Sequence, residues 1–216
     1  MKQAILFANG SMEKPPDLSS FIQSSALVIA VDGGIQKCIS LDIQPNVLIG
    51  DFDSIGYDEM KAFQATGVEI IKYPTHKDET DLELALNYIN NTEVSDVMII
   101  GGLGARWDMT IANILLITNP VYTEMKIHFL DGTQDMFLLR AGENTMIKGN
   151  LGDTLSLIPL VGDVTGVSTQ GLLYPLQNET LQFGTARGVS NVFTLERVQI
   201  NIKHGLLLCI INSVVN

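Results

Sequence analysis

The stretch Val47-Leu48-Ile49-Gly50-Asp51-Phe52-Asp53-Ser54 places two carboxylates directly after a run of branched apolar residues. Such a run is typical of a buried strand, and the glycine at its end leads into a loop. Carboxylates in this arrangement suit Mg²⁺, which takes one or two protein carboxylates and completes its shell with water and phosphate oxygens. Asp also occurs in plain turns, where it accepts hydrogen bonds from the nearby backbone. The octapeptide alone therefore leaves a turn and a metal site as alternatives.

Strand-like and helix-like patterns alternate over the first 130 residues. One helix-like segment is Asp81–Asn90, with Thr80 and Glu83 in the relation of a capping box, and another is Asp108–Thr118, with Asp108 as its N-cap. Continuous apolar strands between helices predict a mainly parallel sheet flanked by helices, an α/β fold. The predicted strands are Gln3–Ala8, Ala26–Val31, Val47–Gly50, Val68–Lys72, Asp96–Ile100 and Lys126–Leu130.

From about Gln134 onward the sequence changes to short strand-like runs separated by Gly, Asn and Asp turns, with no strong helical period. This texture is typical of a small antiparallel sandwich or barrel. We therefore predict an α/β domain over residues 1–140, followed by a smaller all-β sandwich domain over residues 141–216. The strands predicted there are Met136–Leu139, Thr145–Lys148, Thr154–Leu160, Val192–Ile200 and Leu206–Asn212.

Composition narrows the class of function. The chain has 216 residues, of which 46% are hydrophobic, and a formal net charge of −11. This charge argues against a general nucleic-acid surface, which needs concentrated Lys and Arg, but it leaves room for a nucleotide whose charge is met by Mg²⁺. Cys38 and Cys209 lie far apart among apolar residues, so we expect buried thiols and no zinc site. No apolar run suits a signal peptide or a membrane span, and we expect a cytoplasmic protein.

Four loops begin at the carboxyl ends of the predicted parallel strands, where open α/β sheets bind their ligands. Each loop alone could be an ordinary turn or a helix cap. Together they would bring several carboxylates to one edge, and such charges repel unless a cation enters. Glycines before a helix can hold a phosphate, and Arg106 adds a planar anion clamp, so the four loops favour a Mg²⁺–phosphate site. The loops are Asp32–Gly34, Gly50–Ser54, Thr75–Asp81 and Gly101–Asp108.

These motifs, in this order, resemble the thiamine pyrophosphokinase (thiamine diphosphokinase) family. The resemblance implies an α/β catalytic domain followed by a thiamine-binding β-sandwich, assembled as a homodimer. It also implies the reaction, in which ATP and thiamine give thiamine diphosphate and AMP. The matching segments are Asp32–Gly34, Gly50–Ser54, Lys77–Asp81, Gly101–Asn113, Gly171–Leu176 and Arg187–Asn191.

The resemblance also implies roles for single residues. Asp51, Asp53 and Asp81 would hold Mg²⁺, and Asp53, Asp78, Asp81 and Arg106 would act in catalysis, with either Asp78 or Asp81 accepting the hydroxyl proton. Ser190 and Asn191 would meet thiamine from the partner subunit, and Lys77 and Asp78 would lie where the two substrates meet. The residues implied to border ATP are Asp32, Gly33, Gly34, Gly102, Arg106, Asp108, Thr110 and Asn113. Two positions depart from the family pattern: Met109 stands where many bacterial members have His, and Lys77 where Gln is frequent.

Two other classes of function stay open. A phosphatase of the haloacid dehalogenase type also has Asp-x-Asp after an apolar strand. In that class the motif follows the first strand and Thr comes after it, whereas here the motif follows the third strand and Ser54 comes after it. A nucleotide- or thiamine-binding sensor without activity is the second alternative, although every candidate Mg²⁺ carboxylate is present.

Overall fold

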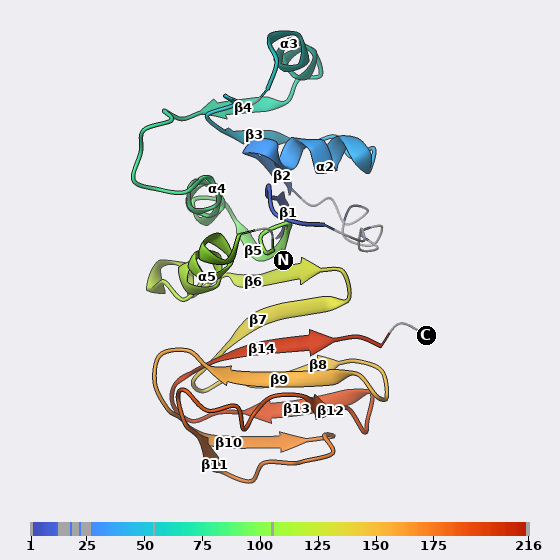
Figure 1. The fold of residues 1–216 in the computed structure, drawn as a ribbon, viewed down its shortest axis with the longest axis vertical. Coiled ribbons are helices and arrows are strands. Elements are labelled where there is room, and N and C mark those ends of the chain that lie inside the picture. Colours follow the sequence, from blue (N-terminus) through green and yellow to red (C-terminus); the bar gives the residue numbers. More distant parts are fainter. Residues whose placement is uncertain are drawn as a thin grey trace. The chain divides into compact units, whose positions relative to one another are not determined.

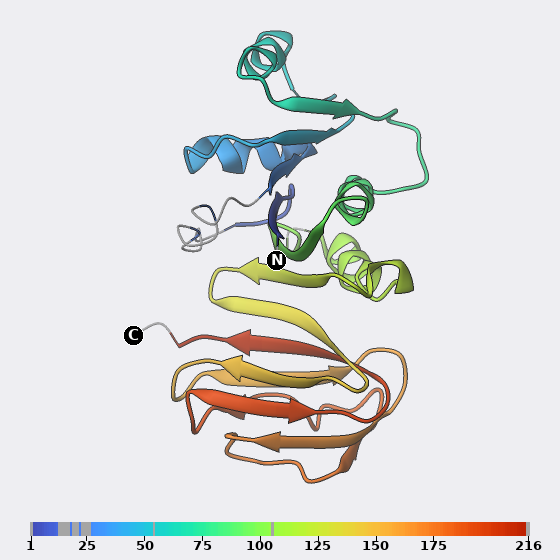
Figure 2. The same cartoon turned by 180° about the vertical axis from the view of Figure 1, so that it is seen from behind.

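The computed structural model describes residues 2–12, 18, 22, 27–53, 55–104 and 106–214. Ala26, Ser54 and Ala105, which belong to a predicted strand and two of the motifs, lie outside these residues. The chain divides into two compact units, Met1–Gly132 and Thr133–Asn216, here called the α/β unit and the β unit. Figure 1 labels their elements, and Figure 2 shows the same ribbon from behind.

The α/β unit contains a parallel sheet with the strand order β6-β5-β1-β2-β3-β4. Its central strands are buried on both faces, which explains their continuous apolar sequences. Helix α2 packs on β1 and β2, and α4 packs on β2 and β3. The strands are β1 (Lys2–Phe7), β2 (Leu27–Val31), β3 (Val47–Gly50), β4 (Glu69–Lys72), β5 (Val94–Ile100) and β6 (Lys126–Asp131). The helices are η1 (Asp32–Gly34), α2 (Ile35–Ser40), α3 (Tyr57–Ala65), α4 (Asp81–Asn90), α5 (Trp107–Leu116) and η2 (Pro120–Tyr122).

Of the two helices predicted in detail, one begins at the predicted residue and the other does not. Helix α4 has the predicted bounds, and the Thr80 hydroxyl accepts a hydrogen bond from Glu83 N at 3.2 Å. Helix α5 begins at Trp107, so the prediction of Asp108 as its N-cap is wrong. Arg106 holds the extended backbone that an N-cap needs (φ −123°, ψ 119°), and Asp108 falls in the first turn.

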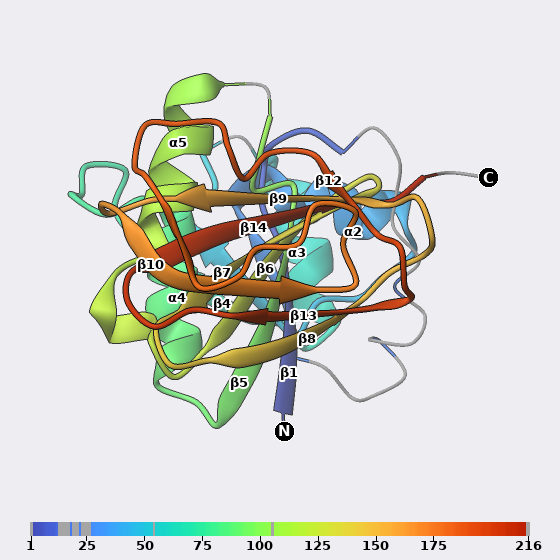
Figure 3. The same ribbon diagram turned by 90° about the horizontal axis from the view of Figure 1, so that it is seen from below.

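The β unit consists of two antiparallel sheets, with the strand orders β12-β9-β14-β7 and β11-β10-β13-β8 (Figure 3). Buried side chains from both sheets form one core, among them Leu139, Leu157, Val167, Ile200 and Leu207. The predicted succession of parallel strands with helices and then antiparallel strands is thereby confirmed. The strands are β7 (Gln134–Arg140), β8 (Asn144–Lys148), β9 (Thr154–Pro159), β10 (Val164–Gln170), β11 (Glu179–Leu181), β12 (Asn191–Val192), β13 (Arg197–Asn201) and β14 (Leu206–Asn212).

Strand β7 pairs with β14 along its whole length, and the compact β unit accordingly begins at Thr133. Two details of this unit differ from the prediction. The single strand predicted over Val192–Ile200 is wrong, since the chain turns between β12 and β13. Strand β10 was not predicted, because its register shifts between Val164 and Val167 and breaks the alternation that reveals a strand. Strand β11, which has three residues, was not predicted either.

Both cysteines are buried, as expected. Burial raises the pKa of Cys38 to about 12 and raises the pKa of Cys209 as well. Among the residues that the structure describes, no helix has the length and apolar character needed to span a membrane.

Candidate active site

A cavity of about 440 Å³ lies at the carboxyl ends of the strands of the α/β unit. All four predicted loops contribute to its lining, and a fifth loop, Asn9–Gly10 after β1, joins them. The cavity therefore brings together polar residues and glycines that lie far apart in the first half of the sequence. Its polar and glycine lining consists of Asn9, Gly10, Asp32, Asp51, Thr75, Lys77, Glu79, Thr80, Asp81, Gly101, Gly102, Gly104, Arg106 and Asn113.

Three carboxylates converge at this edge of the sheet. Asp32, Asp51 and Asp53 each offer an oxygen, and these oxygens lie within 4.8 Å of one another. Phe52, between the two aspartates of the Asp-x-Asp pair, has a left-handed backbone (φ 58°) and is 6% exposed. Its burial anchors the loop so that the carboxylates on either side remain near the surface. Asp51 Oδ1 also accepts a hydrogen bond from Asp53 N at 3.1 Å, so the local turn and the carboxylate group coexist.

This arrangement raises the pKa of Asp32. Burial raises its pKa, the backbone N–H of Gly33 opposes that shift, and repulsion from Asp81, Asp51 and Asp53 raises it further. Its Oδ1 atom is buried and has no hydrogen-bond donor among the described residues. A buried carboxylate oxygen without a partner is costly, and a cation offsets both this cost and the repulsion. The three hard oxygen donors therefore fit Mg²⁺.

Asp81 lines the same cavity but lies outside this three-carboxylate group. The structure thus groups Asp32, rather than Asp81, with Asp51 and Asp53. Lys77 Nζ lies 3.0 Å from Asp81 Oδ1 and also donates a hydrogen bond to Pro74 O at 3.2 Å. The lysine that departs from the family pattern accordingly places a positive charge beside Asp81.

Two side chains of α5 hold the glycine loop that precedes the helix. Thr110 Oγ1 accepts a hydrogen bond from Gly104 N at 3.0 Å and donates one to Arg106 O at 3.1 Å. Asn113 Nδ2 donates to Gly102 O at 2.6 Å, while the Asn113 Oδ1 atom is buried without a partner among the described residues. Thr110 therefore shapes the loop, and Asn113 shapes it while also lining the cavity.

Arg106 lines the cavity, and its side chain is 70% exposed. Its Nε donates a hydrogen bond to Asp108 Oδ1 at 3.1 Å, and its Nη2 also pairs with Asp108. The hydrogen bond from Arg106 lowers the pKa of Asp108 and raises that of the guanidinium. Asp108 thus orients Arg106 from outside the cavity. Next to it, Trp107 is 82% exposed.

The cavity does not include every predicted residue. Gly33, Gly34, Asp53, Asp78, Asp108 and Thr110 belong to the α/β unit but are not part of its lining. Among the polar and glycine residues of the lining, Asn9 and Gly10 belong neither to the four predicted loops nor to the residues assigned from sequence. An Asn-Gly pair directly after an apolar strand is a signal that could have indicated them.

The residues predicted to meet thiamine lie in the β unit. Asn191 Oδ1 accepts hydrogen bonds from Tyr174 N and Val192 N, each at 3.0 Å, and its Nδ2 donates to Tyr174 O at 2.7 Å. Ser190 has a left-handed backbone (φ 59°), and its N–H donates to Ser156 Oγ at 3.1 Å. The Asn191 amide therefore holds the backbone of Tyr174. Tyr174 itself is 67% exposed.

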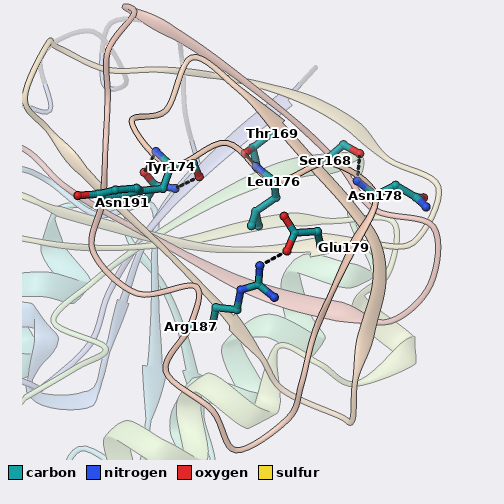
Figure 4. A network of polar contacts seen from close by, with 8 residues as sticks. All are labelled: Ser168, Thr169, Tyr174, Leu176, Asn178, Glu179, Arg187 and Asn191. Atoms are coloured by element: carbon teal, nitrogen blue, oxygen red, sulfur yellow. Dashed lines mark hydrogen bonds and ion pairs between the residues drawn. The ribbon is translucent and has the colours of Figure 1, made fainter.

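Further polar contacts hold the segment that follows Tyr174 (Figure 4). Leu176 N donates to Thr169 Oγ1 and Asn178 N to Ser168 Oγ, both at 2.9 Å. Arg187 pairs with Glu179 across the loop that leads to Asn191. Both motifs of the second half are thus fixed by side chains rather than by long strands.

Comparison with known proteins identifies the family. Residues 18–129 match the family model described as "Thiamin pyrophosphokinase, catalytic domain", and residues 143–207 match "Thiamin pyrophosphokinase, vitamin B1 binding domain". The chain is 30% identical to thiamine pyrophosphokinase of Bacillus subtilis over 210 residues, covering 97% of this chain and 98% of that relative. It is 26% identical to thiamin pyrophosphokinase 1 of Caenorhabditis elegans over 194 residues, covering 84% of this chain and 77% of the relative.

The fold agrees with this relationship. The crystal structure of the Bacillus subtilis thiamine pyrophosphokinase superposes with a TM-score of 0.88 at 28% identity, covering 99% of this chain and 100% of that one. Both halves of the chain therefore match in sequence, and nearly the whole chain matches in structure. The chain belongs to the thiamine pyrophosphokinase family.

Proposed function

We propose that this protein is an ATP- and Mg²⁺-dependent thiamine diphosphokinase, which transfers a diphosphoryl group from ATP to the hydroxyl of thiamine and releases AMP. The observation that carries the proposal is a single cavity, in a chain of this family, whose lining combines Asp32, Asp51 and Asp81 with a glycine loop and Arg106. Asp53 lies beside this lining in the three-carboxylate group. That combination suits a metal-bound polyphosphate.

Each part of the cavity has a task in the proposed reaction. Asp32, Asp51 and Asp53 would hold Mg²⁺, and the ion would supply positive charge that offsets the charge of the phosphates. Arg106, oriented by Asp108, keeps N–H groups that can donate to phosphate oxygens as charge develops. Of the two carboxylates that could accept the hydroxyl proton, Asp81 lines the cavity and Asp78 does not. We therefore assign Asp81 as the group that accepts the hydroxyl proton.

The family resemblance also supports the remaining parts of the proposal. The β unit would supply the thiamine side of the site, through Ser190 and Asn191, in a homodimer that works in the cytoplasm. In this scheme the boundary between the ATP-binding and thiamine-binding domains falls near residue 140.

The deciding experiment incubates the purified protein with Mg²⁺, ATP and thiamine and identifies the products. We expect AMP and thiamine diphosphate in equal amounts. ADP with thiamine monophosphate would mean a different kinase, and phosphate release from a simple monoester without ATP would indicate a phosphatase. Ligand binding without AMP would indicate a sensor.

Asp32→Asn should make the metal-free protein more stable at neutral pH. A carboxyl whose pKa is higher in the folded than in the unfolded state binds its proton more tightly when folded, so stability falls as pH rises from the unfolded pKa through the folded one. The amide carries no such charge, and the variant should lose this fall. Thermal melts across the acid range would measure it.

The same melts with added Mg²⁺ test the metal assignment. Mg²⁺ should raise the Tm of the wild type but not of Asp32→Asn, since binding to the folded state stabilises it. Glu124→Gln, an exposed residue of the same unit, is the matched control and should behave as wild type. An equal Mg²⁺ effect in all three proteins would remove Asp32 from the metal site.

Asn191→Ala should raise the KM for thiamine about tenfold and leave the KM for ATP within about twofold, because the hydrogen bonds that hold the Tyr174 backbone are worth about 1 kcal/mol each. Steady-state kinetics with each substrate varied in turn measures the two constants. Gln199→Ala, which removes an exposed hydrogen bond to Asn144 in the same unit, is the control. Equal changes for both substrates would contradict a role on the thiamine side.

A further inference from the structure

Asn9 lies in the cavity without a role assigned to it so far. It follows β1, and its backbone is held on both sides: Ala8 N donates to Ile100 O at 2.8 Å, and Gly10 N donates to Gly101 O at 2.6 Å. These bonds join the loop after β1 to the glycine loop after β5. The Asn9 side chain is therefore presented from a fixed backbone at the same edge as Asp32 and Asp51.

Gly33 explains how the Asn9 amide is oriented. A Cβ atom at residue 33 would lie 2.4 Å from Asn9 Oδ1, 2.5 Å from Cγ and 2.6 Å from Nδ2. Since the three distances are nearly equal, the flat face of the amide lies against Gly33. Gly33 does not have a left-handed backbone, so its conformation does not require glycine. The missing side chain instead makes room for the amide.

An amide packed on its face keeps its hydrogen-bonding edge open, because the N–H groups and the carbonyl lie in the plane of the group. The Asn9 side chain has no hydrogen-bond partner among the described residues. The strand order β5-β1-β2 places the loop of Asn9 between the glycine loop that leads to Arg106 and the loop that carries Asp32, and all of them line the cavity. A neutral N–H donor between them suits an anionic oxygen without adding to the charge of either side.

We infer that Asn9 Nδ2 donates a hydrogen bond to a phosphate oxygen of the nucleoside triphosphate, and that Gly33 is the residue that positions it. This rests on the proposed function and assigns Asn9 as a nucleotide-binding residue of the same site. Gly33, which the family resemblance places at ATP, acts through Asn9 and does not touch the nucleotide itself.

A double-mutant cycle tests both parts. Asn9→Ala should raise the KM for ATP about tenfold and leave the KM for thiamine unchanged, since one hydrogen bond to a charged group is lost. Gly33→Ala should give a similar rise, because the new methyl group pushes the amide aside. The double variant should be no worse than either single variant, since the second change has nothing left to remove.

Two further variants sharpen the cycle. Asn9→Asp keeps the size but replaces the donor with a charge that repels phosphate, so its KM for ATP should exceed that of Asn9→Ala. Gly56→Ala is the matched glycine control, because a Cβ there meets nothing within 4 Å and the backbone is extended (φ −65°, ψ 151°). Its kinetics should equal those of the wild type. Thermal melts of all variants check that they fold.

The outcomes separate this inference from the proposed function. If the wild type forms AMP and thiamine diphosphate but Asn9→Ala keeps the wild-type KM for ATP, Asn9 does not bind the nucleotide. If the effects of Asn9→Ala and Gly33→Ala multiply in the double variant, Gly33 does not act through Asn9. If the wild type forms no product, the proposed function fails, and calorimetric titration of Mg²⁺–ATP into the same variants still decides whether Asn9 binds a nucleotide.

Discussion

Asp51→Asn should lower kcat about 10³-fold, equivalent to about 4 kcal/mol of activation free energy, and leave the protein folded. Asp51 lines the cavity and belongs to the three-carboxylate group, so in the proposed reaction its charge would help to hold the metal. The Asn side chain keeps an oxygen that can accept the hydrogen bond from Asp53 N, so the loop keeps its shape. Product formation at saturating ATP and thiamine measures the effect.

Stability and activity should separate in this variant. Removing one of several neighbouring negative charges relieves repulsion, so the Tm of the metal-free protein should not fall. Glu124→Gln, which removes an exposed carboxylate away from the cavity, should keep wild-type turnover. A kcat of Asp51→Asn within tenfold of the wild type would remove this residue from the mechanism, and a parallel loss of Tm would assign it a structural role instead.

Gly34→Ala should destabilise the protein by at least about 3 kcal/mol. The backbone at Gly34 is right-handed helical (φ −59°, ψ −18°) and would accept alanine, but the added Cβ would lie 2.0 Å from Phe7 O. Phe7 is fully buried in the central strand β1 and cannot move away. In a chain of this size the Tm should fall by about 6–12 °C, since 1 kcal/mol corresponds to roughly 2–4 °C.

The adjacent glycine supplies the comparison for this prediction. The three atoms nearest to a Cβ at residue 33 all belong to the end of the Asn9 side chain, which can rotate, so the Tm of Gly33→Ala should stay close to that of the wild type. Denaturant unfolding of both variants gives the free energies. A Gly34→Ala variant as stable as Gly33→Ala would show that β1 can shift to admit the methyl group. Of these two neighbouring glycines, Gly34 would thus be required for folding and Gly33 for nucleotide binding.

The sequence predicts those parts of the structure that depend on neighbours along the chain. The apolar runs that form β1, β2 and β3 and the N-terminal cap of α4 are local features, and they lie where expected. The loops after these strands come together because parallel strands end at the same edge, a rule that needs no coordinates.

The remaining features depend on which strands are neighbours in space. The order β5-β1-β2 puts the loop of β1 between the glycine loop and Asp32, and that order cannot be read from the sequence, so Asn9 was missed. In the β unit, the amide of Asn191 is occupied by the backbone of Tyr174, a contact between segments 17 residues apart.

The exposed position of Trp107 has a practical consequence. It is the only tryptophan of the chain, and it stands in the first turn of the helix whose Thr110 and Asn113 hold the glycine loop. Its indole is surrounded largely by water, where emission responds strongly to any new neighbour. The protein therefore carries one exposed tryptophan next in sequence to Arg106, which lines the cavity, and we expect its intrinsic fluorescence to report nucleotide binding without an attached dye.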